Sequence, residues 1–275
     1  MSALDDALHK LKRGKEHLAD FYARIDVAFN ENHITHNVEA YPQIKPFFIN
    51  DPRPWTQYTV YYSSVPVITF EDCILMGEAI QDFRSALDYF AWAWFIKIKS
   101  SLTKWEEWQI SFPMSRNQKS FTDNRNDKLP NFPDWTFIER YQPYQPTDKG
   151  RWMGYLRVLS DTDKHRIIIP APMLPADGIV EIKGFESWGR LIRVIDRLKL
   201  GQEIKKGTQI ISAIIAGVPP AQDQVHVDAT TTIMPVFPIE LIPPTSPDDI
   251  VDVEFNLNGI RDVCEEILTE AAKYF

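Results

Sequence analysis

The chain has 275 residues, of which 44% are hydrophobic and 12% aromatic, and this is enough for one large domain with a sizeable core. Its formal net charge of -8 argues against a protein that binds nucleic acid over its whole surface, because phosphate contacts need concentrated Lys and Arg. Only two cysteines occur, Cys73 and Cys264, each among apolar neighbours in a predicted helix. This usage favours buried, reduced thiols over a secreted disulfide scaffold.

The first stretch, MSALDDALHKLKRGK, mixes acidic and basic residues and has no apolar core of the kind found in a secretion signal. The apolar stretch from Leu87 to Ile98 is too short to cross a bilayer. We therefore expect a cytoplasmic protein with no membrane partner.

Residues 3–30 predict a long amphipathic helix, because apolar residues recur there every three or four positions. The stripe consists of Leu4, Leu8, Leu11, Leu18, Tyr22, Ile25 and Phe29. It could pack on a second helix of the same chain or on a second copy, so a homodimer is left open. The basic segment HKLKRGK, residues 9–15, is interpreted as the solvated face of this helix rather than a nucleic-acid patch.

Residues 33–70 change character and predict two strands around a turn that contains proline. The prolines inside the first run indicate an edge strand or a bulge. A second long helix is expected from about 71 to 100, with so many apolar faces that it should lie at the centre of a bundle. Residues 111–135 are rich in Asn, Asp, Pro and Ser and are read as loops, followed by a short helix capped by Asp134 and another helix from about 148 to 159.

From residue 167 the pattern shifts to short β-like runs separated by Gly and Pro, as in an antiparallel sheet. The last of these runs is DIVDVEFNL, residues 249–257, after which a helix capped by Asn258 closes the chain. The predicted fold class is α+β, with a helical bundle packed beside an antiparallel sheet. We expect one domain over 1–275, with a helical part (about 1–32, 71–166 and 257–275) and a β part (about 33–70 and 167–256).

The stretch GEAIQDFRSALDYFAWAW, residues 77–94, carries an unusual set of polar side chains on an otherwise apolar helix. Arg84 and Asp88 are spaced to pair one turn apart, with Gln81 on the same stripe. A buried guanidinium needs partners for five N–H donors, so another segment should contribute. The run SDTDKHR, residues 160–166, is the expected donor. Two readings are open: a purely structural lock between helices, or a cleft in which His165 exchanges protons near neutral pH.

Four ordered motifs resemble a widespread family of uncharacterised bacterial and phage proteins. They are GEAIQDFRSALDYFAW, then FP, then ERYQPY, then LRVLSDTDKHR, between Gly77 and Arg166. The family pattern is close to G-D-x-x-H-N-L-R-S-A-L-D-H, F-P, Q-P-Y and L-x-x-L-x-x-x-D-K-H-R, and it implies no established activity. Its R-x-x-x-x-H element is also similar to the signature of HEPN-type helical domains, many of which are metal-independent ribonucleases.

The HEPN resemblance implies catalytic roles for Arg84 and, if it lies nearby, for His165. This sequence has Gln81 and Tyr89 where the family has His, and a Tyr with a pKa near 10 is a weak acid–base group at neutral pH. The remaining candidate ligand-binding residues are Gln81, Asp88, Tyr89, Asp163, Lys164 and Arg166.

Other motifs are absent from the sequence. His33 and His36 have no Cys or carboxylate at ligand spacing, and there is no Gly-rich phosphate loop, so we expect neither a metal nor a cofactor. Many Trp and Tyr residues of the helical half, Trp108 among them, are read as core, with a few as walls of a pocket for a flat ligand.

Three functions are therefore open. The first is a protein that binds a small anionic or nucleotide-like ligand, or a partner, at the polar network of the central helix. The second is a HEPN-like ribonuclease of the phage-defence or toxin type. The third is a structural or assembly protein.

Overall fold

A computed structural model describes residues 3–31, 34–43, 54–99, 103–164, 171, 173–183, 189–197, 203–217, 226–237 and 252–275. The fold is α+β, as predicted. The chain forms two compact units: a helical unit (Met1–Ile25, Thr69–Ala171 and Phe237–Phe275) and a β unit (Asp26–Ile68 and Pro172–Val236). The prediction of one domain over 1–275 with a helical and a β part stays a prediction.

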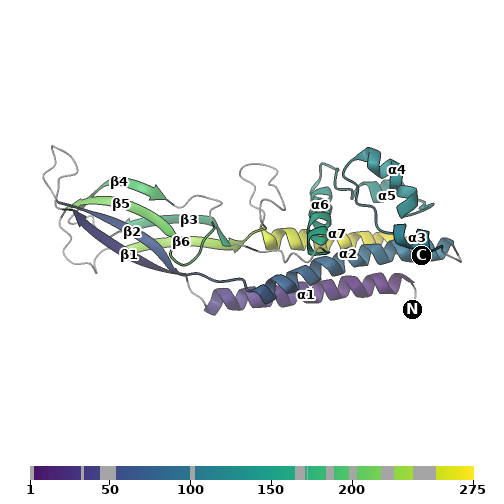
Figure 1. Ribbon diagram of the computed structural model, residues 1–275, viewed down its shortest axis with the longest axis horizontal. Helices are drawn as coiled ribbons and strands as arrows, with labels where there is room; N and C mark the ends of the chain where they lie inside the picture. Colours follow the sequence, from purple (N-terminus) through teal and green to yellow (C-terminus); the bar gives the residue numbers. More distant parts are fainter. Residues whose placement is uncertain are drawn as a thin grey trace. The chain divides into compact units, whose positions relative to one another are not determined.

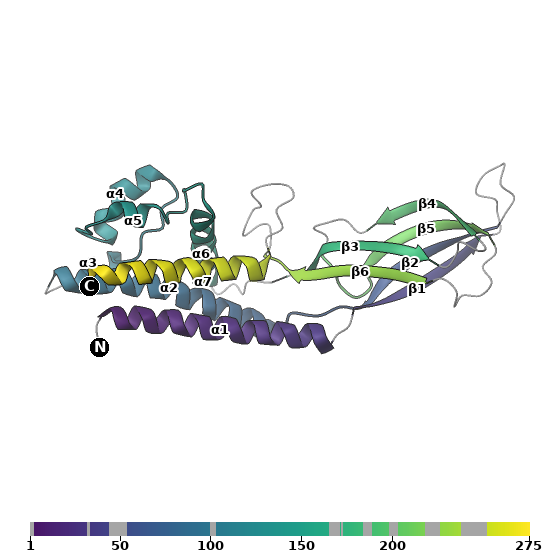
Figure 2. The same cartoon turned by 180° about the vertical axis from the view of Figure 1, so that it is seen from behind.

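The helical unit is built around α2 (Phe70–Ile98), with most of α1 (Ala3–Glu31) and α7 (Val253–Ala271) alongside it and α6 (Asp148–Lys164) crossing (Figures 1 and 2). Three shorter helices complete it: α3 (Lys104–Gln109), α4 (Gln118–Lys128) and α5 (Trp135–Glu139). A 3-10 turn, η2 (Ala272–Tyr274), follows α7. None of the helices that the structure describes combines the length and apolar character needed to cross a membrane.

Helix α2 begins where the sequence supplies a complete cap. The Thr69 hydroxyl accepts from the Asp72 backbone N–H, and the Asp72 carboxylate accepts from the Thr69 N–H at 2.8 Å. Its residues are buried on several sides, with Met76 and Leu87 (0% exposed) on one face and Ala93 (1%) and Phe95 (4%) on the two flanking faces. The expected position of this helix at the centre of the bundle is therefore confirmed.

The β unit contains two antiparallel sheets among its described residues. The first has the order β1-β2-β5-β4, from β1 (Thr35–Gln43), β2 (Trp55–Ser64), β5 (Gln209–Gly217) and β4 (Gly189–Arg197). The second pairs β3 (Met173–Lys183) with β6 (His226–Pro235). The prolines in the first β-like run indicated an edge strand or a bulge, and β1 is an edge strand of this sheet.

Buried aliphatic and aromatic residues of β2 and β5 form the core of the β unit. They include Tyr58, Val60 and Tyr62 of β2 and Ile211, Ala213 and Ile215 of β5. Because β2 pairs with β5 in antiparallel register, with Val60 opposite Ile211 and Tyr58 opposite Ala213, these side chains meet on one face.

Three predicted details are wrong. The C-terminal helix begins at Val253 rather than after Asn258, because the Asp252 carboxylate accepts from the Phe255 N–H at 2.6 Å and caps it there. Leu8, assigned to the buried stripe of α1, is 44% exposed. The supposed loop after 111 contains α4, which Asn117 caps by accepting from the Ser120 N–H and which buries Phe121.

Helices α6 and α7 pack closely at Gly259, where any larger side chain would collide with α6. A Cβ placed at Gly259 of α7 would lie 2.1 Å from Trp152 Cε2 of α6. No real Cβ tolerates such a distance, so the indole occupies the space above Gly259.

Gly259→Ala should therefore lower the free energy of unfolding by about 1–3 kcal/mol, because the added methyl group displaces the Trp152 ring. Gly154→Ala in α6 is the matched control, since its Cβ would meet only Pro143 Cβ at 3.7 Å. That control should gain about 0.5–1 kcal/mol from the reduced backbone entropy of the unfolded chain. Urea unfolding of both variants checks this, and a Gly259→Ala protein as stable as the wild type would contradict the packing.

Candidate functional site

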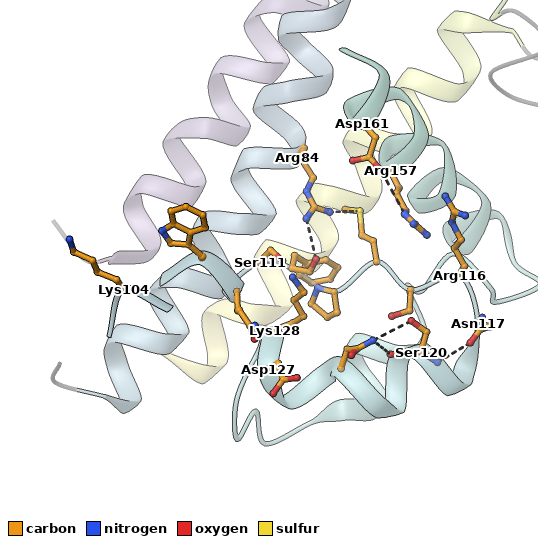
Figure 3. A pocket seen from close by; sticks show the side chains of 17 residues that line it. Arg84, Lys104, Ser111, Arg116, Asn117, Ser120, Asp127, Lys128, Arg157 and Asp161 are labelled. Carbon is orange, nitrogen blue, oxygen red and sulfur yellow. Dashed lines mark hydrogen bonds and ion pairs between the residues drawn. The ribbon is translucent and has the colours of Figure 1, made fainter. Parts of the chain in front are cut away.

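A cavity of about 1040 Å³ opens on the helical unit between α2, α3, α4 and α6. Its wall includes the segment from Ser111 to Asn117, the 111–117 loop, which runs between α3 and α4. Figure 3 shows the labelled side chains around it, with Lys104 of α3 on one side and Arg116 and Arg157 on the other. We call this cavity the basic cleft.

Positive side chains outnumber negative ones in the lining. The cations are Arg84, Lys104, Arg116, Lys128 and Arg157, and the carboxylates are Asp127 and Asp161. The entire chain has a net charge of -8, so this local excess of cations runs against the overall balance. Such a concentration is the electrostatic arrangement that attracts anions into a cleft.

Arg84 connects α2 to the 111–117 loop. Its Nε donates to Asp88 Oδ2 at 3.0 Å, and its Nη2 lies 2.8 Å from Asp88 Oδ1. The Nη2 group also donates to the Phe112 carbonyl at 3.3 Å, and Nη1 contacts Met114 Sδ. The side chain is only 13% exposed, so the predicted pair is formed and largely buried. Among the described residues, the partners of Arg84 other than Asp88 come from the 111–117 loop.

Asp88 and Gln142 hold the same loop from two sides. Asp88 Oδ1 accepts from the Phe112 N–H at 2.9 Å. The fully buried Gln142 accepts from the Ser115 N–H at 2.9 Å and donates to the Pro113 carbonyl at 2.9 Å. Bonds on both sides of Pro113 therefore fix the backbone that leads to Arg116.

These contacts bring together motifs that lie far apart in the sequence. Arg84 and Asp88 belong to the first motif, Phe112 and Pro113 are the FP pair, and Gln142 opens QPY. The three motifs are joined by the hydrogen bonds just described. Together these hydrogen bonds hold the 111–117 loop in position.

Arg157 of α6 lies in a field of like charge. Burial lowers the pKa of its guanidinium, the charge of Arg116 lowers that pKa further, and Asp161 opposes the shift while Arg84 adds to it. Its contact with Asp161 is long, 4.0 Å between Nε and Oδ2, and the carboxylate is 58% exposed. Among the described side chains no carboxylate pairs with Arg116. The cluster is thus only partly neutralised.

The other predicted site residues either lie away from the cleft lining or lie outside the described side chains. Gln81 donates to the Ser160 carbonyl at 2.8 Å and so ties α2 to α6. Tyr89 is 40% exposed and is not part of the cleft lining. The side chains of Asp163 and Lys164, and His165 and Arg166 entirely, lie outside the described residues. Their predicted roles stay predictions.

Sequence reasoning missed Arg116 and Arg157 as site residues. Arg157 is the second residue of the LRVL motif, and Arg116 follows the FP pair by three positions. The position of each arginine in or beside a motif was the sequence signal that could have identified it as a site residue. Nothing in the spacing alone showed that the two side chains face one cavity.

The opposite side of α2 binds α1 through buried Asp82, which is 5% exposed. Lys10 Nζ lies 2.7 Å from Asp82 Oδ1, and Arg13 Nε lies 3.6 Å from Oδ2. The segment 9–15 is therefore not simply the solvated face that was predicted, since two of its cations serve this helix contact. Within the described residues no group of three or more His, Cys, Asp or Glu side chains is placed to hold a metal ion.

Arg84→Ala should lower the free energy of unfolding by about 2–3 kcal/mol, because it leaves Asp88 and the Phe112 carbonyl short of a charged donor. Arg157→Ala removes an arginine from the same cleft and is the matched control. It should change stability by less than about 0.5 kcal/mol, since the one ion pair that Arg157 forms among the described side chains is 4.0 Å long and its partner Asp161 is 58% exposed. Chemical unfolding of both proteins is the measurement, and equal effects would contradict a special role for Arg84.

Comparison of the chain with models of protein families, with curated proteins and with solved structures found no match. The family resemblance and the HEPN similarity stay predictions, and the function must be inferred from the cleft.

Proposed function

We propose that this protein binds an anionic, phosphate-bearing ligand in the basic cleft. The observation that carries the proposal is that Arg116 and Arg157 line one cavity in which no carboxylate of the described side chains neutralises both. Guanidinium groups present planar sets of N–H donors that match phosphate oxygens. An anion with two negative charges would supply acceptors for N–H donors of Arg116 and Arg157 that the described side chains do not occupy.

The like charges around Arg157 give a physical reason for this preference. Bringing Arg84, Arg116 and Arg157 together in a partly buried wall costs free energy, as the lowered pKa of Arg157 indicates. A bound anion would remove that repulsion and add charge-assisted hydrogen bonds. Ligand binding would therefore stabilise the folded protein.

Arg84 has a different role in this proposal. Asp88, Phe112 and Met114 make four contacts to its five N–H donors, so it mainly positions the 111–117 loop. This supports a combined reading, in which the predicted structural lock and the predicted anion site exist together. The lock lies in the wall of the cleft, and Arg116 and Arg157 face the ligand.

The ribonuclease alternative depends on Arg84 and His165 acting together on RNA. The contacts of Arg84 favour a positioning role, and RNA enters our proposal only as one carrier of phosphate groups. We further propose a cytoplasmic setting, which the two free buried thiols of Cys73 and Cys264 support.

Binding of pyrophosphate, ribose 5-phosphate and a short single-stranded RNA, measured by titration calorimetry, tests the proposal. Arg116→Gln and Arg157→Gln should each weaken binding about tenfold, because each removes a charged donor worth about 1.5–3 kcal/mol. Affinity should also fall as salt is raised.

Arg261→Gln is the matched control for this experiment. It removes the same charge from α7, outside the cleft lining, where Arg261 pairs with Asp262 at 2.8 Å. Wild-type affinity is expected for this variant. If none of the three probes binds, or if all three variants weaken binding alike, the proposal is wrong. Metal-free cleavage of the RNA by the wild type, lost in Arg84→Ala while the variant stays folded, would support the ribonuclease alternative.

A further inference from the structure

Trp108 is the most exposed large apolar side chain at the basic cleft. It lines the cavity from α3, and 88% of its surface is exposed. Most of the other aromatic residues of the helical unit are packed in the core, among them Phe112, Phe121 and Tyr141, each exposed by 1% or less. A tryptophan left in water beside a cluster of cations has its flat ring available to a ligand.

From this arrangement we infer that the ligand is a nucleoside phosphate, with its base stacked on Trp108 and its phosphate at Arg116 and Arg157. This inference rests on the proposed function, because it requires the cleft to bind phosphate. The inference adds to the proposed function that the phosphate of the ligand is attached to a nucleoside. Stacking platforms of exposed aromatic rings beside basic grooves are the usual means of holding unpaired bases.

The positions of the groups fit such a ligand. Trp108 follows Lys104 by four residues on α3, so the two side chains share one face of that helix. Lys104 lies across the cleft from Arg116 and Arg157 in Figure 3. A ligand that spans the cleft would therefore meet a ring at one end and guanidinium groups at the other.

The wall between these ends carries neutral hydrogen-bonding groups. Gln109 and Ser111 lie on the α3 side, and Asn117, Ser120 and Asn124 lie at α4. Amide and hydroxyl groups can both donate to and accept from the edges of a base or a sugar. A charged wall along the whole length would suit a plain polyanion instead.

A second, smaller cavity lies beside the basic cleft. This cavity of about 380 Å³, lined in part by Asn126, Pro130 and Asn131, shares Gln109 and Asp127 with the basic cleft. The same chemistry could thus come from a free nucleotide or from a single strand that follows both cavities.

Titration of AMP, ribose 5-phosphate and a four-residue oligoadenylate into the wild type, Trp108→Ala and Trp108→Phe tests the inference. AMP should bind the wild type about tenfold more tightly than ribose 5-phosphate, which is the size of effect expected for one stacked base. Trp108→Ala should abolish this difference while leaving ribose 5-phosphate binding unchanged, and Trp108→Phe should retain most of it. Because Trp108 is so exposed, thermal unfolding of all three proteins should coincide.

Equal binding of AMP and ribose 5-phosphate to the wild type would overturn this inference and leave the proposed function standing. So would a Trp108→Ala variant that weakens both ligands alike or neither. Failure of all three ligands to bind would overturn this inference, and failure of pyrophosphate as well would overturn the proposed function. If AMP shows the expected dependence on Trp108, the oligoadenylate distinguishes the source: tighter binding than AMP indicates a single strand, and equal binding indicates a free nucleotide.

Discussion

The need to satisfy one nearly buried guanidinium organises this site. Arg84 cannot turn its N–H groups to bulk water, because its side chain is 13% exposed, so each donor needs a protein partner. Asp88 lies one helical turn away and supplies the charge, while the backbone at Phe112 supplies a further acceptor. The loop between α3 and α4 is thereby held against α2. A displaced loop would leave both members of the ion pair with unmet hydrogen bonds.

The same principle applies elsewhere on α2, where polar side chains bind different neighbouring segments. Asp82 binds α1 through Lys10, and Gln81 binds the backbone of α6 at Ser160. Apolar burial favours a central position for this helix but does not specify which neighbour lies on which side. Directed polar contacts add that information, since the wrong partner would leave a buried charge unpaired. The polar stripe of an otherwise apolar helix is thus explained by the arrangement of its neighbours.

The sequence predicted the fold class, the central helix and the Arg84–Asp88 pair because each depends on local periodicity. The predicted start of α7 was wrong because two nearby residues can both cap a helix. Asp252 forms the cap, rather than Asn258 later in the same segment. The sequence did not predict the contacts of Arg84 with Phe112 and Met114, and the expected partners at 163–166 lie outside the described side chains and stay a prediction. Loop contacts of this kind depend on tertiary packing, and no helical or strand period encodes them. Arg116 and Arg157 were missed for the same reason.

The arginines of this cleft differ in how closely the described carboxylates match them, and this difference separates the structural role of Arg84 from the binding role proposed for Arg116 and Arg157. Arg84 has its charge matched by Asp88 and gives up most of its donors to the fold. Arg116 is carried by the loop that Arg84 fixes, and Arg157 is carried by the helix that Gln81 fixes. Among the described side chains no carboxylate pairs with Arg116, and the contact of Arg157 with Asp161 is 4.0 Å long, while each arginine sits on an element that other contacts hold in place. Burial lowers the pKa of Arg157 and the charge of Arg116 lowers it further, so the two like charges oppose each other, and in the proposed function a bound anion would remove this repulsion.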